Sequence, residues 1–205
     1  MKLLAFSDVH TDLMACHRLV EMATENSVQV AVGAGDFATM RRNLQPVIDV
    51  LSGFTCPLVL VPGNGESIEE LQEACQRYPR MHVLHGTGAM IEGQSFFGLG
   101  YAVPETPFGA WSCDLAEDSA TAMLRSCPTN SVLVTHSPPF GHVDQNSRGQ
   151  HVGSQAILQT IQRTNPKLVL CGHVHDCWQT SSQVGSTPIH NLGPAGWLLD
   201  VPKAS

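Results

Sequence analysis

The chain has 205 residues, of which 42% are hydrophobic and 14% are charged, with a formal net charge of −7; this composition is that of a globular protein and excludes an intrinsically disordered chain. A sequence-independent nucleic-acid-binding protein would need clustered Lys and Arg, which the 11 basic residues do not form. The apolar run at 3–6 is too short for a secretion signal, and no run approaches the roughly 20 residues of a membrane span. The cysteines show no Cys-x-x-Cys spacing, which gives no indication of a structural zinc site. A single cytoplasmic domain over residues 1–205, without a membrane segment, is therefore expected.

In chain order, apolar runs typical of strands alternate with segments of helical periodicity. Strands over 3–6, 28–32, 57–61 and 82–84 alternate with helices over 13–24, 44–51 and 68–77. A hairpin over 89–99, a Pro-rich and aromatic loop over 100–112, a helix over 115–125, a strand over 132–135, a helix over 154–164 and a strand over 168–171 follow. Beyond residue 176 the helical period is lost, and strands are predicted over 178–184, 188–192 and 197–201.

Two helix starts carry the capping-box pattern, in which two side chains three residues apart satisfy unpaired backbone N–H groups. These are Ser67 with Glu70, and Asp114 with Glu117. The alternating α/β first part and the antiparallel strands added at the end predict an α/β protein, with layered sheets and helices on the outside.

Five short groups of metal-ligand residue types each follow an apolar run. Because the carboxyl ends of strands in an open α/β sheet share one edge, these residues would meet there. Each group alone has an ordinary explanation, such as a helix cap, a turn or a hairpin, whereas all five in order indicate a site. The groups are Asp8-Val9-His10, Gly35-Asp36, Gly63-Asn64-Gly65-Glu66, Thr135-His136-Ser137-Pro138-Pro139 and Gly172-His173-Val174-His175.

The Gly-His-x-His group is the most informative of the five. On an extended segment His173 and His175, two residues apart, project to the same side. The same pair fits a mononuclear zinc site completed by an acid elsewhere. The residues alone therefore leave the number of metal ions open.

Together, these groups resemble the calcineurin-like metallophosphoesterase family in its short, single-domain bacterial and archaeal form. The resemblance extends over most of the chain and includes the stretches 106–108, 136–142, 149–154 and 192–194. It implies a four-layer α/β/β/α sandwich of two mixed sheets, with a dinuclear metal centre at the rim and a small phosphoester as substrate.

By this resemblance, Asp36 bridges two metal ions that the other ligands hold in two sets. The set Asp8, His10 and His175 holds the first ion, and the set Asn64, His136 and His173 holds the second. Mixed imidazole and oxygen donors suit Mn, which we favour, or Fe or Zn, rather than Mg or Ca. The implied reaction is attack on phosphorus by a metal-bound hydroxide, on diesters or on small monoesters.

Two departures from the family pattern bear on function. Gly65 stands where much of the family has a histidine that assists the leaving group, and His142 and His151, in the loop after His136, are candidates to replace it. An equally good interpretation is that these two histidines only bind backbone groups of their own loop. The second Asp that the protein serine/threonine phosphatase branch expects after Asp36 is absent, which disfavours a phosphoprotein phosphatase.

Substrate contacts are assigned to Asn64, Arg41, Tyr101 and Phe108. Arg41 could contact a phosphate or could simply be exposed to solvent. Tyr101 and Phe108 could contact an apolar leaving group or could pack their loop against the core. The helix beginning at Ser67 is expected to direct its N–H groups to the same rim. Cys171 is expected to be a buried thiol rather than a ligand.

The function predicted is thus a metal-dependent phosphoesterase. One rival is a non-catalytic protein-binding scaffold on the same fold whose metal centre has decayed, which the retention of all the ligand types disfavours. The other is a mononuclear zinc hydrolase that acts on amide or ester carbonyls. Metal analysis combined with a turnover assay distinguishes the three.

Overall fold

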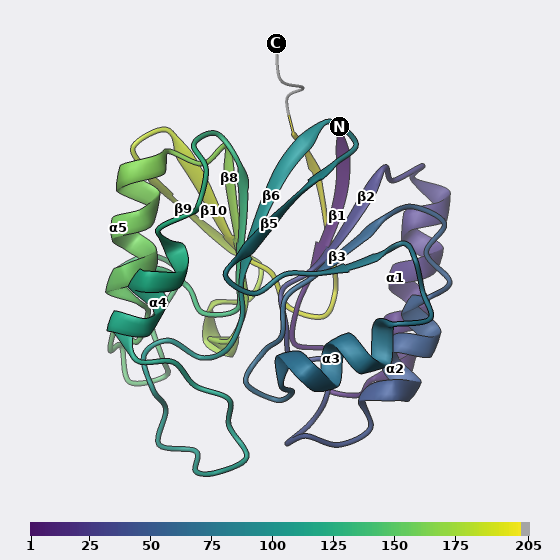
Figure 1. The fold of residues 1–205 in the computed structure, drawn as a ribbon, viewed down its shortest axis with the longest axis horizontal. Coiled ribbons are helices and arrows are strands. Elements are labelled where there is room, and N and C mark those ends of the chain that lie inside the picture. Colours follow the sequence, from purple (N-terminus) through teal and green to yellow (C-terminus); the bar gives the residue numbers. More distant parts are fainter. Residues whose placement is uncertain (202–205) are drawn as a thin grey trace.

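A computed structural model describes residues 1–201, which form two β-sheets packed face to face with helices on both outer faces (Figure 1). The first sheet has the strand order β11-β1-β2-β3-β4. Its strands are parallel except β11, which runs antiparallel to β1. The strands are β1 (Lys2–Phe6), β2 (Val30–Gly33), β3 (Leu58–Leu60), β4 (Met81–Val83) and β11 (Trp197–Asp200).

The second sheet has the order β5-β6-β7-β8-β10-β9. The four central strands run parallel, and the hairpin partners β5 and β9 add antiparallel edges. The strands are β5 (Thr87–Ile91), β6 (Gln94–Leu99), β7 (Val132–Thr135), β8 (Leu168–Cys171), β9 (Thr180–Val184) and β10 (Thr187–Asn191). Both sheets are therefore mixed.

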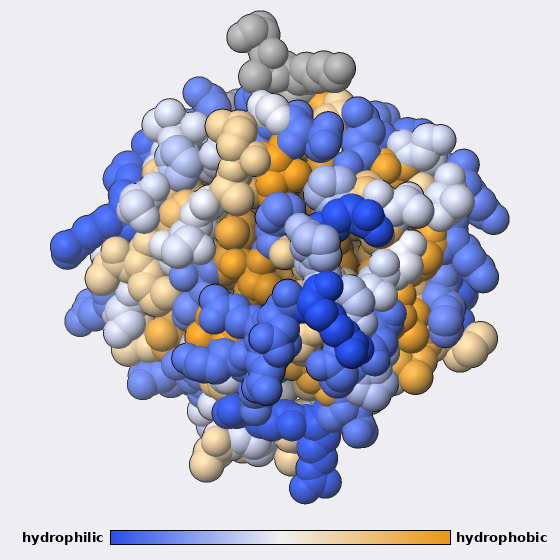
Figure 2. Space-filling view, turned by 45° about the vertical axis from the view of Figure 1, so that its right-hand side comes forward, coloured by the Kyte–Doolittle hydropathy of each residue, from blue (hydrophilic) through white to orange (hydrophobic). Residues whose placement is uncertain are grey.

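Helices α1 (Leu13–Glu25), α2 (Leu44–Leu51) and α3 (Ile68–Cys75) cover the outer face of the first sheet, and α4 (Glu117–Leu124) and α5 (Gln155–Thr164) cover that of the second (Figure 1). This is the expected four-layer α/β/β/α sandwich. No helix within residues 1–201 is both long enough and apolar enough to cross a membrane. On the face drawn in Figure 2, apolar residues lie among hydrophilic ones, as is usual for a protein surface.

The strand residues alternate between two cores because successive side chains point to opposite faces of a sheet. In β1, Leu4 and Phe6 pack against the helices, whereas Leu3 and Ala5 pack between the sheets. Strands that are buried on both faces have continuous apolar sequences, and these apolar runs are the pattern from which the strands were predicted.

One of the two capping boxes is confirmed and the other is wrong. Ser67 and Glu70 cap α3 reciprocally, as expected. Helix α4 begins at Glu117 instead of residue 115, and Asp114 does not cap it. Glu117 accepts from the backbone N–H groups of Gln155 and Ala156, so this carboxylate caps α5.

Near the C-terminus, strand β9 begins at Thr180, two residues later than expected. A short 3₁₀ helix over His175–Cys177 occupies the preceding turn. The parallel strands of both sheets end at the same side of the molecule, the lower side in Figure 1, where the long loops lie. All five ligand groups follow strands at this edge.

Candidate metal centre

The loops after β1 and β2 bring Asp8, His10 and Asp36 together. Backbone N–H groups of Asp8 and His10 donate to the carbonyls of Gly35 and Asp36 at 2.9 and 3.0 Å, which holds the two loops side by side. All three residues have positive φ, of 54°, 42° and 57°. Left-handed backbone is costly for residues other than glycine and clusters at functional sites, so the fold maintains strain at this point.

Asp8 is buried and held from several directions. Its carboxylate accepts from the backbone N–H of His173, at 3.1 and 3.2 Å to its two oxygens, and its Oδ2 accepts from the indole Nε1 of Trp178 at 3.1 Å and from the Ser7 hydroxyl. A Cβ on Gly172 would lie 2.4 Å from Asp8 Oδ2. The glycine before His173 is thus required by the close approach of this carboxylate.

The first group of donors is formed by Asp8, His10 and His175. The Nε2 atoms of His10 and His175 lie 3.2 Å apart, and His175 Nε2 lies 3.8 Å from Asp8 Oδ1. The candidate ligand atoms of the three residues all lie within 4.8 Å of one another. This is the set that the family resemblance implied for the first ion.

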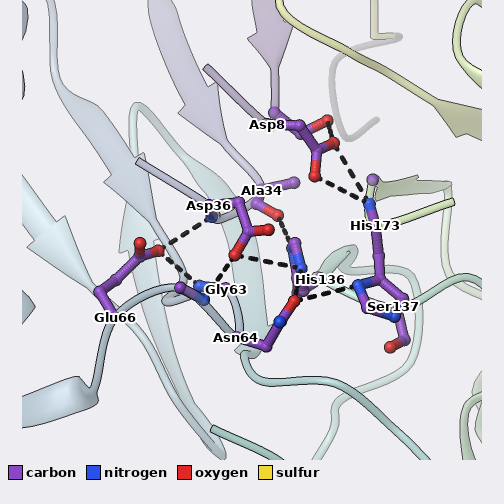
Figure 3. A network of polar contacts seen from close by, with 12 residues as sticks. Asp8, Ala34, Asp36, Gly63, Asn64, Glu66, His136, Ser137 and His173 are labelled. Atoms are coloured by element: carbon purple, nitrogen blue, oxygen red, sulfur yellow. Dashed lines mark hydrogen bonds and ion pairs between the residues drawn. The ribbon is translucent and has the colours of Figure 1, made fainter. Parts of the chain in front are cut away.

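The second group lies around His136 and Asn64 (Figure 3). His136 Nδ1 lies 2.8 Å from the Ala34 carbonyl, to which it donates, so Nε2 faces the site, 3.1 Å from Asn64 Oδ1. Asn64 Oδ1 is also 3.1 Å from His173 Nδ1. Asp36 Oδ1 lies 3.5 Å from His136 Nε2, which joins Asp36 to this second group.

His173 and His175 do not share one side of an extended segment, contrary to expectation. His173 has φ of +68°, and His175 begins the 3₁₀ helix. The turn between them sends His173 toward Asn64 and His175 toward His10. Cys171 is buried as expected, with its Sγ 3.4 Å from the His190 carbonyl.

Glu66 is fully buried and ties the loops of the site together (Figure 3). Its Oε1 accepts from the backbone N–H groups of Asp36 and Gly63 at 2.9 and 2.7 Å, and its Oε2 accepts from Ala38 at 2.9 Å. Burial and the Asp36 charge raise the pKa of Glu66 to about 7. The sequence placed this residue in a ligand-type group but did not indicate its structural role.

The electrostatics of the site fit bound cations. Burial raises the pKa of Asp8. Burial and the neighbouring His136 lower the pKa of His173 to about 3, which keeps that imidazole neutral with a lone pair to donate. Within residues 1–201 neither Asp8 nor Asp36 forms an ion pair with Lys or Arg. Buried carboxylates need a compensating charge, and the donor set suits divalent metal ions.

Asp114, expected as a helix cap, instead anchors the loop over the site. It accepts from the Thr106 backbone N–H and hydroxyl at 2.8 and 2.9 Å and from the Ser112 hydroxyl at 2.6 Å. Asn64 Nδ2 in turn donates to Ser112 Oγ at 3.1 Å. This contact turns the Asn64 carbonyl oxygen toward His136 and His173.

Two of the expected substrate contacts are engaged elsewhere. Arg41 Nε and Nη2 donate to the two carboxylate oxygens of Glu70, at 2.8 and 2.9 Å. The Tyr101 hydroxyl accepts from the Ile68 backbone N–H at 3.0 Å. That N–H and the N–H of Glu70, which donates to Ser67 Oγ, are therefore paired within the protein. These two N–H groups at the start of α3 are not free to bind a ligand at the rim.

A cavity of about 530 Å³ lies beside the centre and is lined by His173 and His175. Phe108 lines it too, is 51% exposed and stacks on Trp111 with ring centroids 5.8 Å apart. His151 is also on its wall, whereas His142 lies outside the lining and its Nδ1 contacts Ser182 Oγ at 2.8 Å. The structure thus separates the two loop histidines.

Several residues of the site carried no readable signal in the sequence. Trp178 lies over His175, with ring centroids 4.2 Å apart, besides donating to Asp8. Ser112 orients Asn64, and Asp144 contacts His151 Nδ1 at 2.5 Å. These contacts join segments far apart in the chain, and no local pattern encodes them.

The fold and the site define a metallophosphoesterase-type protein. The family model for the calcineurin-like phosphoesterase superfamily domain matches residues 1–204. The chain therefore belongs to the calcineurin-like phosphoesterase superfamily, as its motifs indicated.

Two Caenorhabditis elegans proteins align with parts of the chain. UPF0046 protein K07C11.7 is 33% identical over 93 residues, which is 45% of this chain and 31% of that protein. UPF0046 protein T07D4.2 is 44% identical over 46 residues, 22% of this chain and 12% of that protein. The alignments thus span less than a third of the length of these relatives.

Solved structures show the same fold at low identity. The protein TT1561 of Thermus thermophilus superposes with a TM-score of 0.76 at 19% identity, covering 95% of this chain and 90% of that one. A dimetal phosphatase from Danio rerio gives 0.63 at 13%, covering 95% and 88%. An archaeal phosphodiesterase gives 0.58 at 16%, covering 94% and 84%.

Proposed function

We propose that this chain is a phosphoester hydrolase that depends on two divalent cations and acts on small-molecule diesters or small monoesters. Mn is the favoured metal, with Fe or Zn as alternatives. When bound, two such ions activate a water molecule and neutralise the negative charge of the phosphoryl oxygens. The residues proposed to hold them are Asp8, His10, Asp36, Asn64, His136, His173 and His175.

The observation that carries the proposal is the position of Asp36 between the two groups of donors. Its Oδ2 lies 3.6 Å from His10 Nε2, and its Oδ1 lies 3.5 Å from His136 Nε2. A carboxylate that offers one oxygen to each group fits a bridging ligand. Oδ1 also accepts from the Gly65 backbone N–H at 2.7 Å, which fixes the carboxylate in this orientation.

The protein's own contacts prepare the site by orienting each donor. The Ala34 carbonyl fixes the ring of His136, and Ser112 fixes the amide of Asn64. Such outer contacts hold ligand atoms where a metal ion needs them and set which ring nitrogen is free. They support a functioning centre over a decayed one.

The lining of the cavity beside the centre favours binding of an uncharged, apolar leaving group. Pro104, Pro107 and Phe108 form an apolar wall, and the charged residues among its lining are the acidic Glu105 and Asp176. Because no Lys or Arg of residues 1–201 is among this lining, little in the cavity favours a dianion. We therefore favour singly charged diesters, with Phe108 contacting the departing group.

The test is turnover of bis(p-nitrophenyl) phosphate by protein stripped with a chelator and then reloaded with Mn, Fe or Zn. Activity is expected only after reloading, with two metal ions per chain by elemental analysis. Orthophosphate is expected to inhibit. The exposed acid Asp118 on α4 supplies the matched control Asp118→Asn, expected to retain both metals and activity.

Two results would overturn the proposal. Full metal loading without turnover on any phosphoester would indicate a binding scaffold. A single ion per chain, with no inhibition by orthophosphate, would indicate the mononuclear hydrolase.

A further inference from the structure

A second polar pair, Asp144 with His151, lies in the loop between β7 and α5, outside the proposed ligand set. Asp144 is 0% exposed. Its Oδ2 accepts from the backbone N–H groups of Gly141 and Gly153 at 3.0 and 2.9 Å, and its Oδ1 lies 2.5 Å from His151 Nδ1. A buried carboxylate thus holds a single imidazole.

The loop is built closely around this carboxylate. A Cβ on Gly153 would lie 2.8 Å from Asp144 Oδ2, so a side chain at that position would displace it. The Val152 backbone N–H donates to the Asp144 carbonyl at 3.1 Å, which closes the loop. Since Nδ1–H of His151 donates to Asp144, Nε2 is the ring nitrogen left for another partner.

The imidazole of His151 is on the wall of the cavity that His173 and His175 also line. Its side chain is 39% exposed, so protons can reach it from solvent. Nε2 lies 3.4 Å from the amide nitrogen of the exposed Gln145. That distance is long for a hydrogen bond, and an oxygen atom of a ligand in the cavity can replace the amide.

The other imidazoles near the rim have different partners. His142 Nδ1 contacts Ser182, and His85 Nδ1 accepts from the Gly100 backbone N–H at 3.0 Å. Gly65 has no side chain, and a Cβ there would lie 2.9 Å from the Ala38 carbonyl oxygen. Of the imidazoles that line the cavity in residues 1–201, His151 is the one outside the proposed ligand set.

We propose that His151 is the catalytic residue that protonates the leaving group, and that Asp144 positions it. This inference rests on the proposed phosphoesterase function. As the oxygen of water bonds to phosphorus and the P–O bond to the leaving group breaks, His151 Nε2–H passes its proton to the departing oxygen. The attacking water releases its proton to solvent, and neutral His151, with Nδ1–H still on Asp144, regains a proton from solvent.

The test compares His151→Gln with wild-type protein on a series of phosphodiesters whose leaving groups range from nitrophenol to simple alcohols. General acid assistance is worth roughly 100-fold to 10,000-fold and matters most for poor leaving groups. We expect kcat to fall by about 100-fold or more for alkyl esters and by only a few-fold for nitrophenyl esters. The dependence of rate on leaving-group pKa therefore becomes steeper.

Three controls accompany this comparison. His17→Gln, on the exposed face of α1, is expected to leave every rate unchanged. Metal content is expected to stay the same in His151→Gln, which separates proton delivery from ligation. His142→Gln is expected to leave the slope unchanged, and a steeper slope in that variant instead would overturn the assignment.

A measurement that does not depend on turnover is nitrogen NMR of the histidine rings. In wild-type protein, His151 is expected to carry its proton on Nδ1 when neutral, and Asp144→Asn is expected to shift this signal. If wild-type protein hydrolyses the esters but His151→Gln leaves the slope unchanged, this inference alone fails. If wild-type protein, loaded with metal, hydrolyses none of them, the proposed function fails with it.

Discussion

The buried carboxylate of Glu66 makes the most direct prediction, because its partners are three backbone N–H groups of the loops that carry the site. Glu66→Ala removes the acceptor of Asp36, Gly63 and Ala38 at once. Glu66→Gln keeps one oxygen for two of these groups and turns an NH₂ group toward the third. The two variants therefore differ in how many buried donors they leave without an acceptor.

The expected magnitudes follow from this count. A buried N–H left unpaired costs about 1–3 kcal/mol, so Glu66→Ala is expected to lower the free energy of unfolding by about 3–9 kcal/mol. Glu66→Gln is expected to lower it by about 1–3 kcal/mol. Domains are stable by only about 5–15 kcal/mol, so the alanine variant is expected at the edge of folding.

The assay is urea unfolding of chelator-treated protein, followed by circular dichroism. Glu73→Gln is the matched control, because Glu73 lies exposed on the same helix, α3, and a surface change is expected to stay within about 0.5 kcal/mol. If Glu66→Ala unfolds within 1 kcal/mol of wild-type protein, on the order of a single neutral hydrogen bond, the structural role assigned to Glu66 is wrong.

Three further predictions concern the site. Asp36→Asn is expected to lower the content of both metal ions and to abolish turnover, whereas His10→Ala is expected to deplete mainly one ion. Two metal ions per chain together with wild-type activity in Asp36→Asn would refute the bridging assignment. Bis(p-nitrophenyl) phosphate is expected to be cleaved at least as well as p-nitrophenyl phosphate, and negligible diesterase activity beside clear monoesterase activity would contradict this. Gly65→His is expected to lower the Tm and the metal content, since its Cβ would lie 2.9 Å from the Ala38 carbonyl oxygen and 3.1 Å from Asp36 Oδ1. If both the Tm and the metal content stay unchanged, the loop can accommodate a side chain at position 65 and this prediction is wrong.

Local signals predicted the elements well where the deciding interactions are local. The capping box of Ser67 and Glu70 closes within one helical turn, and it forms as expected. The Asp114 and Glu117 pair has the same spacing but does not form a box. The Asp114 carboxylate instead accepts hydrogen bonds from Thr106 and Ser112 in the loop, and the Glu117 carboxylate accepts from the start of α5. Donors from distant segments thus compete with the local backbone N–H groups for these carboxylates.

The roles of the aromatic residues also depended on packing. Tyr101 caps α3 through its hydroxyl, and Trp178 donates to Asp8. Phe108 lines the cavity, and its contact with a substrate stays a prediction. In the sequence each is only an aromatic residue, and the folded loops alone give the three residues different roles.

By itself, the sequence determined the layered α/β architecture and the ligand types at the rim. Apolar runs buried on both faces mark the strands, and each donor group follows directly on such a run. The family resemblance implied how the donors divide, and the tertiary structure alone showed the backbone turn behind that division. The positive φ of His173 turns it toward Asn64 while His175 meets His10, and the buried Asp144 selects His151 over His142 as the imidazole held at the cavity. These choices depend on contacts between loops far apart in the chain, which local periodicity does not encode.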